Sequence, residues 1–151
     1  MTVQIVFSPE EAGKRGAMYF PDNRVIEIYR SGLAESAVEQ VAGVAALADD
    51  PMTELLFLAH ELGHHNTVLF SLGTGRFDAS DPDATYTEEV WAWRFARKLL
   101  AARDCRWLAA LDLKAKQELE GYREGLQISR ELAMAIEERV DARLAEFTCA
   151  G

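Results

Sequence analysis

The sequence contains no long apolar run and only two cysteines. No stretch approaches the ~20 apolar residues that a membrane-spanning helix needs, so we do not expect a membrane protein. The N-terminus has no basic segment followed by an apolar one, which argues against a signal peptide. Cys105 and Cys149 form no CxxC pair and are expected to be free thiols. Together these absences predict a cytoplasmic protein.

Positive charge is also scarce, because 16 lysines and arginines stand against 25 acidic residues and the formal net charge is -9. A chain this acidic lacks the excess of basic residues that a phosphate backbone attracts, which argues against nucleic-acid binding. The composition, with 49% hydrophobic and 27% charged residues, is ordinary for a folded protein. A single domain over residues 1–151 is expected, and it is long enough to bury a core.

Short apolar runs near the N-terminus predict three strands, at residues 3–7, 17–20 and 24–29. A turn signal, Pro21-Asp22-Asn23, separates the last two runs. We therefore expect a small antiparallel sheet, with Ile26 and Ile28 directed toward the core.

Helical patterns follow the strands. Helices are expected at 33–47, from about Pro51 to Asn66, at 88–102, near 111–121 and at 129–147, with a long loop at 67–87. Gly121 and Gly125 are expected to mark a break between the last two helices. The order predicts an α+β domain, with strands in 1–30, a helical core in 33–102 and C-terminal helices in 103–151.

The strongest chemical signal is the segment His60-Glu61-Leu62-Gly63-His64 on the second predicted helix. Residues four apart project from nearly the same helix face, so both imidazoles can bind one metal ion. Glu61 lies about 100° around the helix from His60, where it can take a proton from an activated water. Gly63 leaves room for close packing of another element. The alternative is a buried helix whose histidines are satisfied by their neighbours.

A third ligand must come from elsewhere, because the remaining histidine, His65, is rotated about 100° from His64 and is expected to be solvated or hydrogen-bonded. Glu88 and Glu89 flank the buried face of the next predicted helix almost equally. The segment Thr85-Tyr86-Thr87-Glu88 matches a capping box, which would give Glu88 a structural role. Glu89 is therefore the expected ligand, with Glu88 as the alternative.

The region from about Gly16 to Leu100 resembles the ImmA/IrrE family of metallopeptidases, close to minimal glutamate zincins. The similarity covers the segments 16–20 and 25–28, the His60–His64 motif and the helix ending at Leu100. Two positions depart from the family pattern: Trp91 stands where a Glu is common, and Asn66 where a hydrophobic residue is usual.

The resemblance implies a zincin-like fold in which a small sheet packs on the active-site helix. It also implies one zinc ion per chain, held by two histidines and a downstream Glu, with Glu61 as general base. The substrate it implies is a peptide or protein, such as a repressor-type regulator.

Two further readings compete with an active peptidase. One is a non-catalytic, zinc-containing protein-interaction domain, and the other is a helical interaction protein without metal. For the peptidase, we expect strand 24–29 to offer a free sheet edge to substrate, unless it is an interior strand with both edges paired. The 67–87 loop would then shape the site, and Tyr86 or Tyr19 would be nominal candidates to stabilise the oxyanion.

Overall fold

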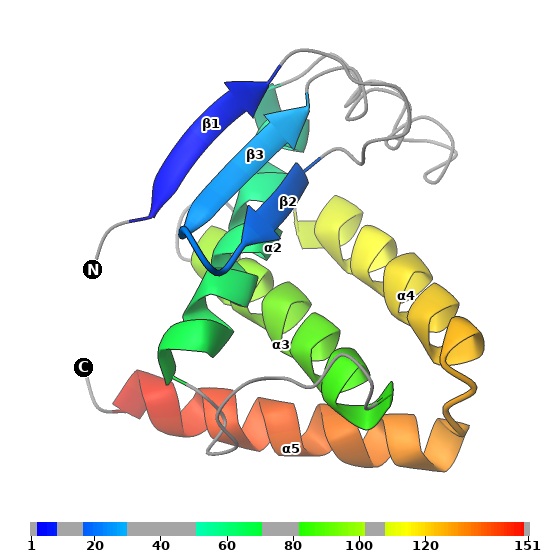
Figure 1. The fold of residues 1–151 in the computed structure, drawn as a ribbon. Helices are drawn as coiled ribbons and strands as arrows, with labels where there is room; N and C mark the ends of the chain where they lie inside the picture. Colours follow the sequence, from blue (N-terminus) through cyan, green and yellow to red (C-terminus); the bar gives the residue numbers. More distant parts are fainter. Residues whose placement is uncertain (1–2, 9–16, 30–50, 71–81, 102–107, 150–151) are drawn as a thin grey trace.

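The fold is α+β, with a three-stranded sheet followed by four helices in the part of the chain that the structure describes (Figure 1). The structure is a computed structural model, and it describes residues 3–8, 17–29, 51–70, 82–101 and 108–149. The helix expected at 33–47 lies outside these ranges, as do Cys105 and residues 71–81 of the expected loop.

The sheet contains β1 (Gln4–Ser8), β2 (Ala17–Phe20) and β3 (Val25–Tyr29) in the order β1-β3-β2. β2 and β3 form an antiparallel hairpin, closed by a turn in which Arg24 adopts a positive φ of 56°. β1 runs parallel to β3, so the expectation of a purely antiparallel sheet is wrong for this pair. The reason is topological: the last strand inserts between the first two rather than adding at the edge.

β3 is therefore the central strand, and both of its edges are paired. The expectation that strand 24–29 offers a free edge to substrate is wrong, and the alternative of an interior strand with both edges paired is confirmed. Two side chains of β3, Ile26 and Ile28, explain its central position. They are 0% and 1% exposed, respectively, and form the core of the sheet with Ala17. A strand this apolar is most stable with a partner on each side and a helix on its face. In the described sheet, β1 and β2 are the edge strands.

The two central helices are α2 (Pro51–Phe70) and α3 (Pro82–Ala101), and each begins with proline, which suits the first helical position. Both extend into the expected loop, since residues 67–70 and 82–87 are helical. The Thr85–Glu88 segment consequently lies inside α3 and is not a cap. Thr87 instead hydrogen-bonds the Asp83 carbonyl oxygen at 2.6 Å, one turn earlier.

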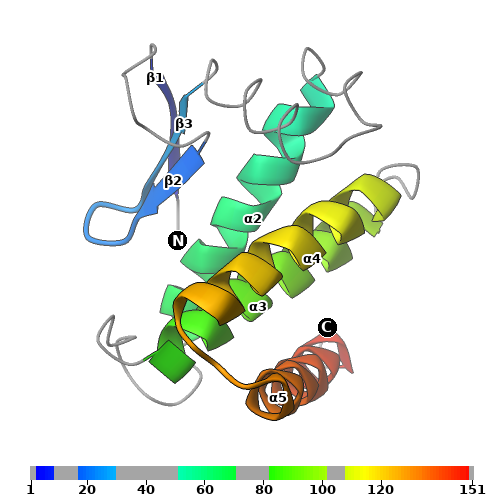
Figure 2. The ribbon, with the colours of Figure 1, turned by 90° about the vertical axis from the view of Figure 1, so that its right-hand side faces the viewer.

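α2 lies between the sheet and the remaining helices (Figure 2). It crosses α3 so closely that a Cβ added at Gly63 would lie 2.5 Å from the Ala92 Cα. The close packing anticipated at Gly63 is confirmed, and the element that approaches it is α3. Glycine is required there because the neighbour is backbone and cannot rotate away.

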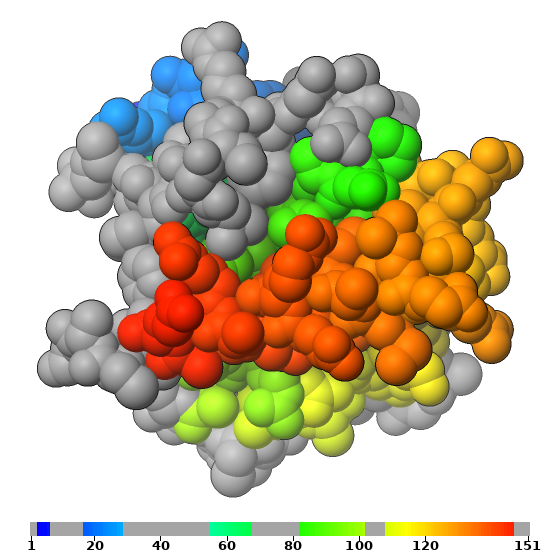
Figure 3. All heavy atoms as spheres, turned by 90° about the horizontal axis from the view of Figure 1, so that it is seen from below, coloured from blue at the N-terminus to red at the C-terminus, as the bar shows by residue number. Residues whose placement is uncertain are grey.

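α4 (Leu108–Gly125) and α5 (Arg130–Cys149) pack on α3 and complete the main apolar core. Figure 3 shows α5 lying across one face of the molecule. α4 ends in a Schellman motif: Ile128 N–H donates to the Arg123 carbonyl at 2.9 Å, and Gln127 has a φ of 57°. Ser129 then caps α5 through the Leu132 N–H at 3.1 Å. Gly125 thus ends α4, whereas Gly121 lies inside it.

None of the helices in the described ranges combines the length and apolar character needed to cross a membrane.

Candidate metal centre

The two motif histidines of α2 face each other as their spacing predicts. His60 Nε2 and His64 Nε2 lie 3.0 Å apart, and the rings meet edge to face. Both side chains are largely buried, His60 being 7% exposed. Two ring nitrogens that converge in a buried place are suited to a shared cation.

Glu89 of α3 completes the group. Its Oε2 lies 3.5 Å from His60 Nε2, and its Oε1 lies 3.5 Å from His64 Nε2. One ligand atom from each of the three residues falls within 4.8 Å of the others, an arrangement that can hold a metal ion. Of the two acids proposed as third ligand, the structure therefore brings Glu89 to the histidine nitrogens that face each other.

Glu88 contacts the opposite side of His64. Its Oε1 lies 3.1 Å from His64 Nδ1. A carboxylate at Nδ1 favours the tautomer with the proton on that nitrogen, which leaves the Nε2 lone pair directed at the cluster. Burial lowers the pKa of His64, but the hydrogen bond to Glu88 and the charges of Glu89 and Glu61 outweigh it and raise the pKa to about 9. The surroundings of His64 thus favour positive charge at the ring, either as a second proton or as a cation bound at Nε2.

His60 has a different environment. Burial lowers its pKa well below the usual value, and the charges of His64 and Lys114 act in the same direction. Its ring stacks on Trp93 with centroids 4.1 Å apart. His60 Nδ1 is buried and has no hydrogen-bond partner among the described residues. The neutral imidazole that this environment favours is the form that binds metal.

Glu61 lies next to the cluster and is not part of it. It is 6% exposed, and burial raises its pKa to about 7, partly offset by His64. Its carboxylate accepts a hydrogen bond from the backbone N–H of Tyr19 in β2. Glu61 therefore lies between α2 and an edge strand of the sheet.

Trp91 and Asn66, two positions singled out in the sequence, contact each other. Trp91 Nε1 donates a hydrogen bond to Asn66 Oδ1 at 3.2 Å across the α2–α3 contact. Trp91 is almost fully buried and belongs to the main core. A polar residue at position 66 satisfies the indole N–H that a tryptophan at position 91 brings into the core.

α4 contributes residues that the sequence analysis did not find. Burial raises the pKa of Glu89, although the charge of His64 and a side-chain hydrogen bond donated by Tyr122 act in the opposite direction. Lys114, also buried, lies 2.6 Å from Glu118. The signal was present in the spacing, because residues 114, 118 and 122 recur every fourth position beside the apolar stripe 111, 115 and 119.

The remaining candidates have structural partners. His65 is buried, and its Nδ1 lies 2.6 Å from the Tyr19 hydroxyl, so it is hydrogen-bonded as expected but not solvated. Tyr86, a nominal oxyanion candidate, is buried and donates to Glu137 of α5 at 3.1 Å. Its hydroxyl is thus committed to the contact between α3 and α5.

The arrangement offers two imidazole nitrogens and one carboxylate from two crossing helices, with a second buried carboxylate beside them. This set can hold a cation and can accept a proton next to it. Comparisons of the chain with protein-family models, with curated proteins and with solved structures found no match.

Proposed function

We propose that the protein is a zinc-dependent metallopeptidase. The observation that carries the proposal is the convergence of His60, His64 and Glu89 with Glu61 at their side. The resemblance to the ImmA/IrrE family supports the same conclusion. A cytoplasmic location and a repressor-type protein as substrate remain part of the proposal and rest on the sequence.

The donor set fits zinc. Two histidine nitrogens and one carboxylate are the ligands of catalytic zinc sites, which keep a fourth position open for water or substrate. The Glu88 contact at Nδ1 leaves Nε2 of His64 to serve as a ligand. Nε2 of His60 faces Glu89 and His64, and its Nδ1 has no hydrogen-bond partner among the described residues. When bound, zinc supplies a Lewis acid that lowers the pKa of a water at the open position and polarises the scissile carbonyl.

Glu61 is the residue we assign to proton transfer. It follows His60 in the sequence, is not one of the three converging residues, and accepts a hydrogen bond from the backbone N–H of Tyr19 in β2. Its carboxylate takes a proton from the attacking water and returns it to the leaving amine. Burial removes competing solvent from this carboxylate, which suits a group that exchanges protons with a substrate.

The substrate backbone is proposed to lie along β2 rather than along the central β3. β2 is an edge strand of the described sheet, and α2 packs against it. The Tyr19 backbone N–H reaches Glu61, which places this edge next to the proposed general base. An extended peptide can pair with such an edge through main-chain hydrogen bonds.

The same Tyr19–Glu61 contact also suits the non-catalytic alternative. A buried carboxylate that accepts a backbone N–H can serve only to fasten β2 to α2. In that case the zinc-containing domain would act by binding a partner. The substitution Glu61→Gln distinguishes the two functions. It should abolish hydrolysis if the protein is a peptidase, and there is no hydrolysis to lose if the protein only binds a partner.

The test combines metal analysis with a cleavage assay. We expect one zinc per chain in the wild type, loss of zinc in His60→Ala, and retention of zinc with loss of hydrolysis in Glu61→Gln. Cleavage of a mixed peptide library, read by mass spectrometry, should fall about 10²–10⁴-fold in Glu61→Gln because general base catalysis contributes that much. Full zinc content in His60→Ala would refute the site, and unchanged cleavage in Glu61→Gln would refute the mechanism.

A further inference from the structure

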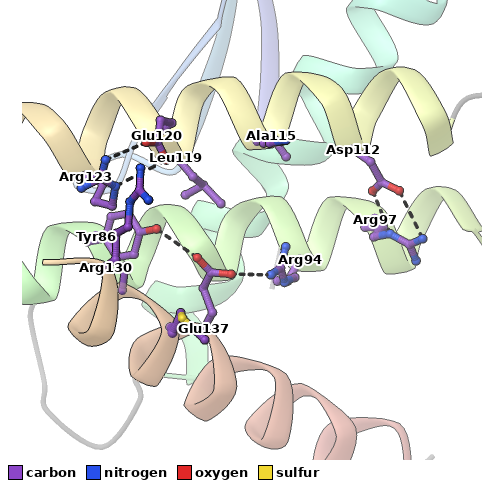
Figure 4. Close-up of a pocket in the computed structure, with 13 residues that line it drawn as sticks. Tyr86, Arg94, Arg97, Asp112, Ala115, Leu119, Glu120, Arg123, Arg130 and Glu137 are labelled. Atoms are coloured by element: carbon purple, nitrogen blue, oxygen red, sulfur yellow. Dashed lines mark hydrogen bonds and ion pairs between the residues drawn. The ribbon is translucent and has the colours of Figure 1, made fainter. Parts of the chain in front are cut away.

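A groove separate from the metal centre lies between α3, α4 and α5 (Figure 4). Its volume is about 540 Å³. The charged residues that line it are five basic and three acidic ones, Arg94, Arg97, Lys116, Arg123, Arg130, Asp112, Glu120 and Glu137. The lining residues thus carry more positive than negative charge, in a chain whose formal net charge is -9. Two acids outside the lining also pair with its arginines, Asp141 with Arg94 at 3.0 Å and Glu124 with Arg123 at 3.7 Å.

Each acid of the groove is already engaged by an arginine. Asp112 accepts from Arg97 at 2.8 Å, and Glu137 accepts from Arg94 at 3.1 Å. Figure 4 shows Glu137 between Arg94 and the Tyr86 hydroxyl, which also donates to it. These contacts bind α3 to α4 and to α5 and leave those carboxylates little capacity for other cations.

Two cations remain. Lys116 of α4 and Arg130 at the start of α5 are exposed and have no hydrogen-bond or ion-pair partner within the residues that the structure describes. Both lie near Glu120, whose pKa is lowered first by its hydrogen bond from Arg123 and further by Arg130 and Lys116. Because Arg123 already engages Glu120 at 2.6 Å, the carboxylate does not neutralise all three cations.

The floor and rim of the groove also offer apolar surface. Ala115 and Leu119 of α4 and Ala133 of α5 are buried there. Met134, on the rim, is 62% exposed, the highest value among the exposed large hydrophobic side chains of the described residues. A methionine that is both exposed and next to cations suits a ligand with apolar and acidic groups.

The length of the groove selects the kind of ligand. On α4 it runs from Asp112 to Arg123, which is about 16 Å at ~1.5 Å per residue. This is longer than a small anion but matches about five residues of extended chain or about eleven of helix. We infer that the groove binds an acidic segment of a partner polypeptide, with its carboxylates at Lys116 and Arg130 and an apolar side chain at Met134.

The site is independent of the proposed peptidase chemistry, although it shares helices with it. Tyr122, which holds Glu89, is the neighbour of Arg123, which lines the groove. Tyr86 of the groove is one turn before Glu89 on α3. A bound segment would therefore contact the same two helices that carry the third metal ligand and its hydrogen-bond donor.

The experiment uses a displayed library of random peptides about twelve residues long, to match the ~16 Å groove as a helix. Selection on the full wild-type chain should enrich peptides with glutamate or aspartate next to apolar residues. An enriched peptide and its Glu→Gln counterpart are then compared by fluorescence anisotropy, with the peptide's integrity checked by mass spectrometry. We expect the acidic peptide to bind at least about tenfold more tightly, the effect of two exposed ion pairs.

The matched variants reverse charge inside and outside the groove. Lys116→Glu with Arg130→Glu should lose about tenfold or more in affinity, because two attractions become repulsions. The control, Arg139→Glu with Arg143→Glu, changes net charge equally on exposed positions of α5 that do not line the groove, and should bind as the wild type does.

Three results would overturn the inference. One is a selection that enriches no acidic peptides. Another is an equal loss of affinity in both double variants, which would indicate unspecific charge attraction. The third is a wild-type dimer that the groove variant alone dissociates, since the occupant would then be a second copy of this chain.

Discussion

The substitution Gly63→Ala tests whether the close crossing of α2 and α3 sets the geometry of the metal centre. The added Cβ would lie 2.5 Å from the Ala92 Cα and 2.6 Å from its carbonyl oxygen. Ordinary contact begins at 3.4 Å, so the helices must separate by roughly 1 Å. Both neighbouring atoms are backbone, so no side-chain rotation can relieve the contact.

The expected loss of stability follows from two opposing effects. Overpacking of a well-packed core costs about 1–3 kcal/mol, and a backbone clash belongs near the upper end. Replacing glycine by alanine inside a helix contributes about 1 kcal/mol in the other direction. We expect Gly63→Ala to lower the free energy of unfolding by about 1–2 kcal/mol.

The effect on the metal should be larger than the effect on the fold. Glu89 is three residues before Ala92 on α3, so a helix displaced by roughly 1 Å at Ala92 moves the carboxylate by a similar amount. Metal–ligand distances tolerate only about 0.2 Å. We therefore expect zinc affinity, measured by competition with a chelator, to fall at least about tenfold.

Gly121→Ala is the matched control, because a Cβ added there meets nothing within 4 Å. It should raise the free energy of unfolding by up to about 1 kcal/mol and leave zinc affinity unchanged. Adding Ala92→Gly to Gly63→Ala should not rescue affinity, since the clash is with the backbone of residue 92. Wild-type zinc affinity and stability in Gly63→Ala would show that the crossing is not a constraint.

Three other outcomes are expected. Glu88→Gln should weaken zinc binding about 10–100-fold, because His64 loses the carboxylate at Nδ1. Glu89→Gln removes a ligand and should not retain zinc at stoichiometric concentration. Equal zinc affinity in the two variants would contradict these roles. A chelator should lower the melting temperature of the wild type, because a ligand present at 100 times its Kd stabilises the folded state by about 2.7 kcal/mol. The chelator should leave the melting temperature of His60→Ala unchanged. Gln127→Gly should raise the free energy of unfolding in urea by about 1 kcal/mol, because it removes the side chain from a positive φ; a decrease would mean that the Gln127 side chain stabilises the turn.

Elements defined by local patterns were predicted well from the sequence. The strands at 17–20 and 25–29 follow from β-branched and apolar runs around a turn signal, and the α+β order follows from the change in periodicity. His60 and His64 needed only the 3.6-residue period to be placed together. These features depend only on residues that are close together in the sequence, so they can be predicted from a single sequence.

Elements defined by tertiary contacts were not predicted. The parallel pairing of β1 with β3 depends on where the last strand inserts, which no local pattern records. The apparent capping box at 85–88 was misleading because α3 already begins at Pro82. Tyr122 was missed because its role arises only when α4 packs against α3. Each of these features requires elements that are distant in the sequence to meet.

Local sequence patterns do not decide between Glu88 and Glu89 as the third ligand, whereas the packing of α3 on α2 does. On a helical wheel the two acids flank the buried face of α3 almost equally, and each lies about 100° from the other. The crossing at Gly63 breaks this symmetry, because Ala92 must face α2 at the point of closest approach. Glu89, one turn before Ala92, then faces the Nε2 atoms of both histidines, while Glu88 reaches only His64 Nδ1. A glycine in the motif thus selects which acid of the partner helix can be a ligand.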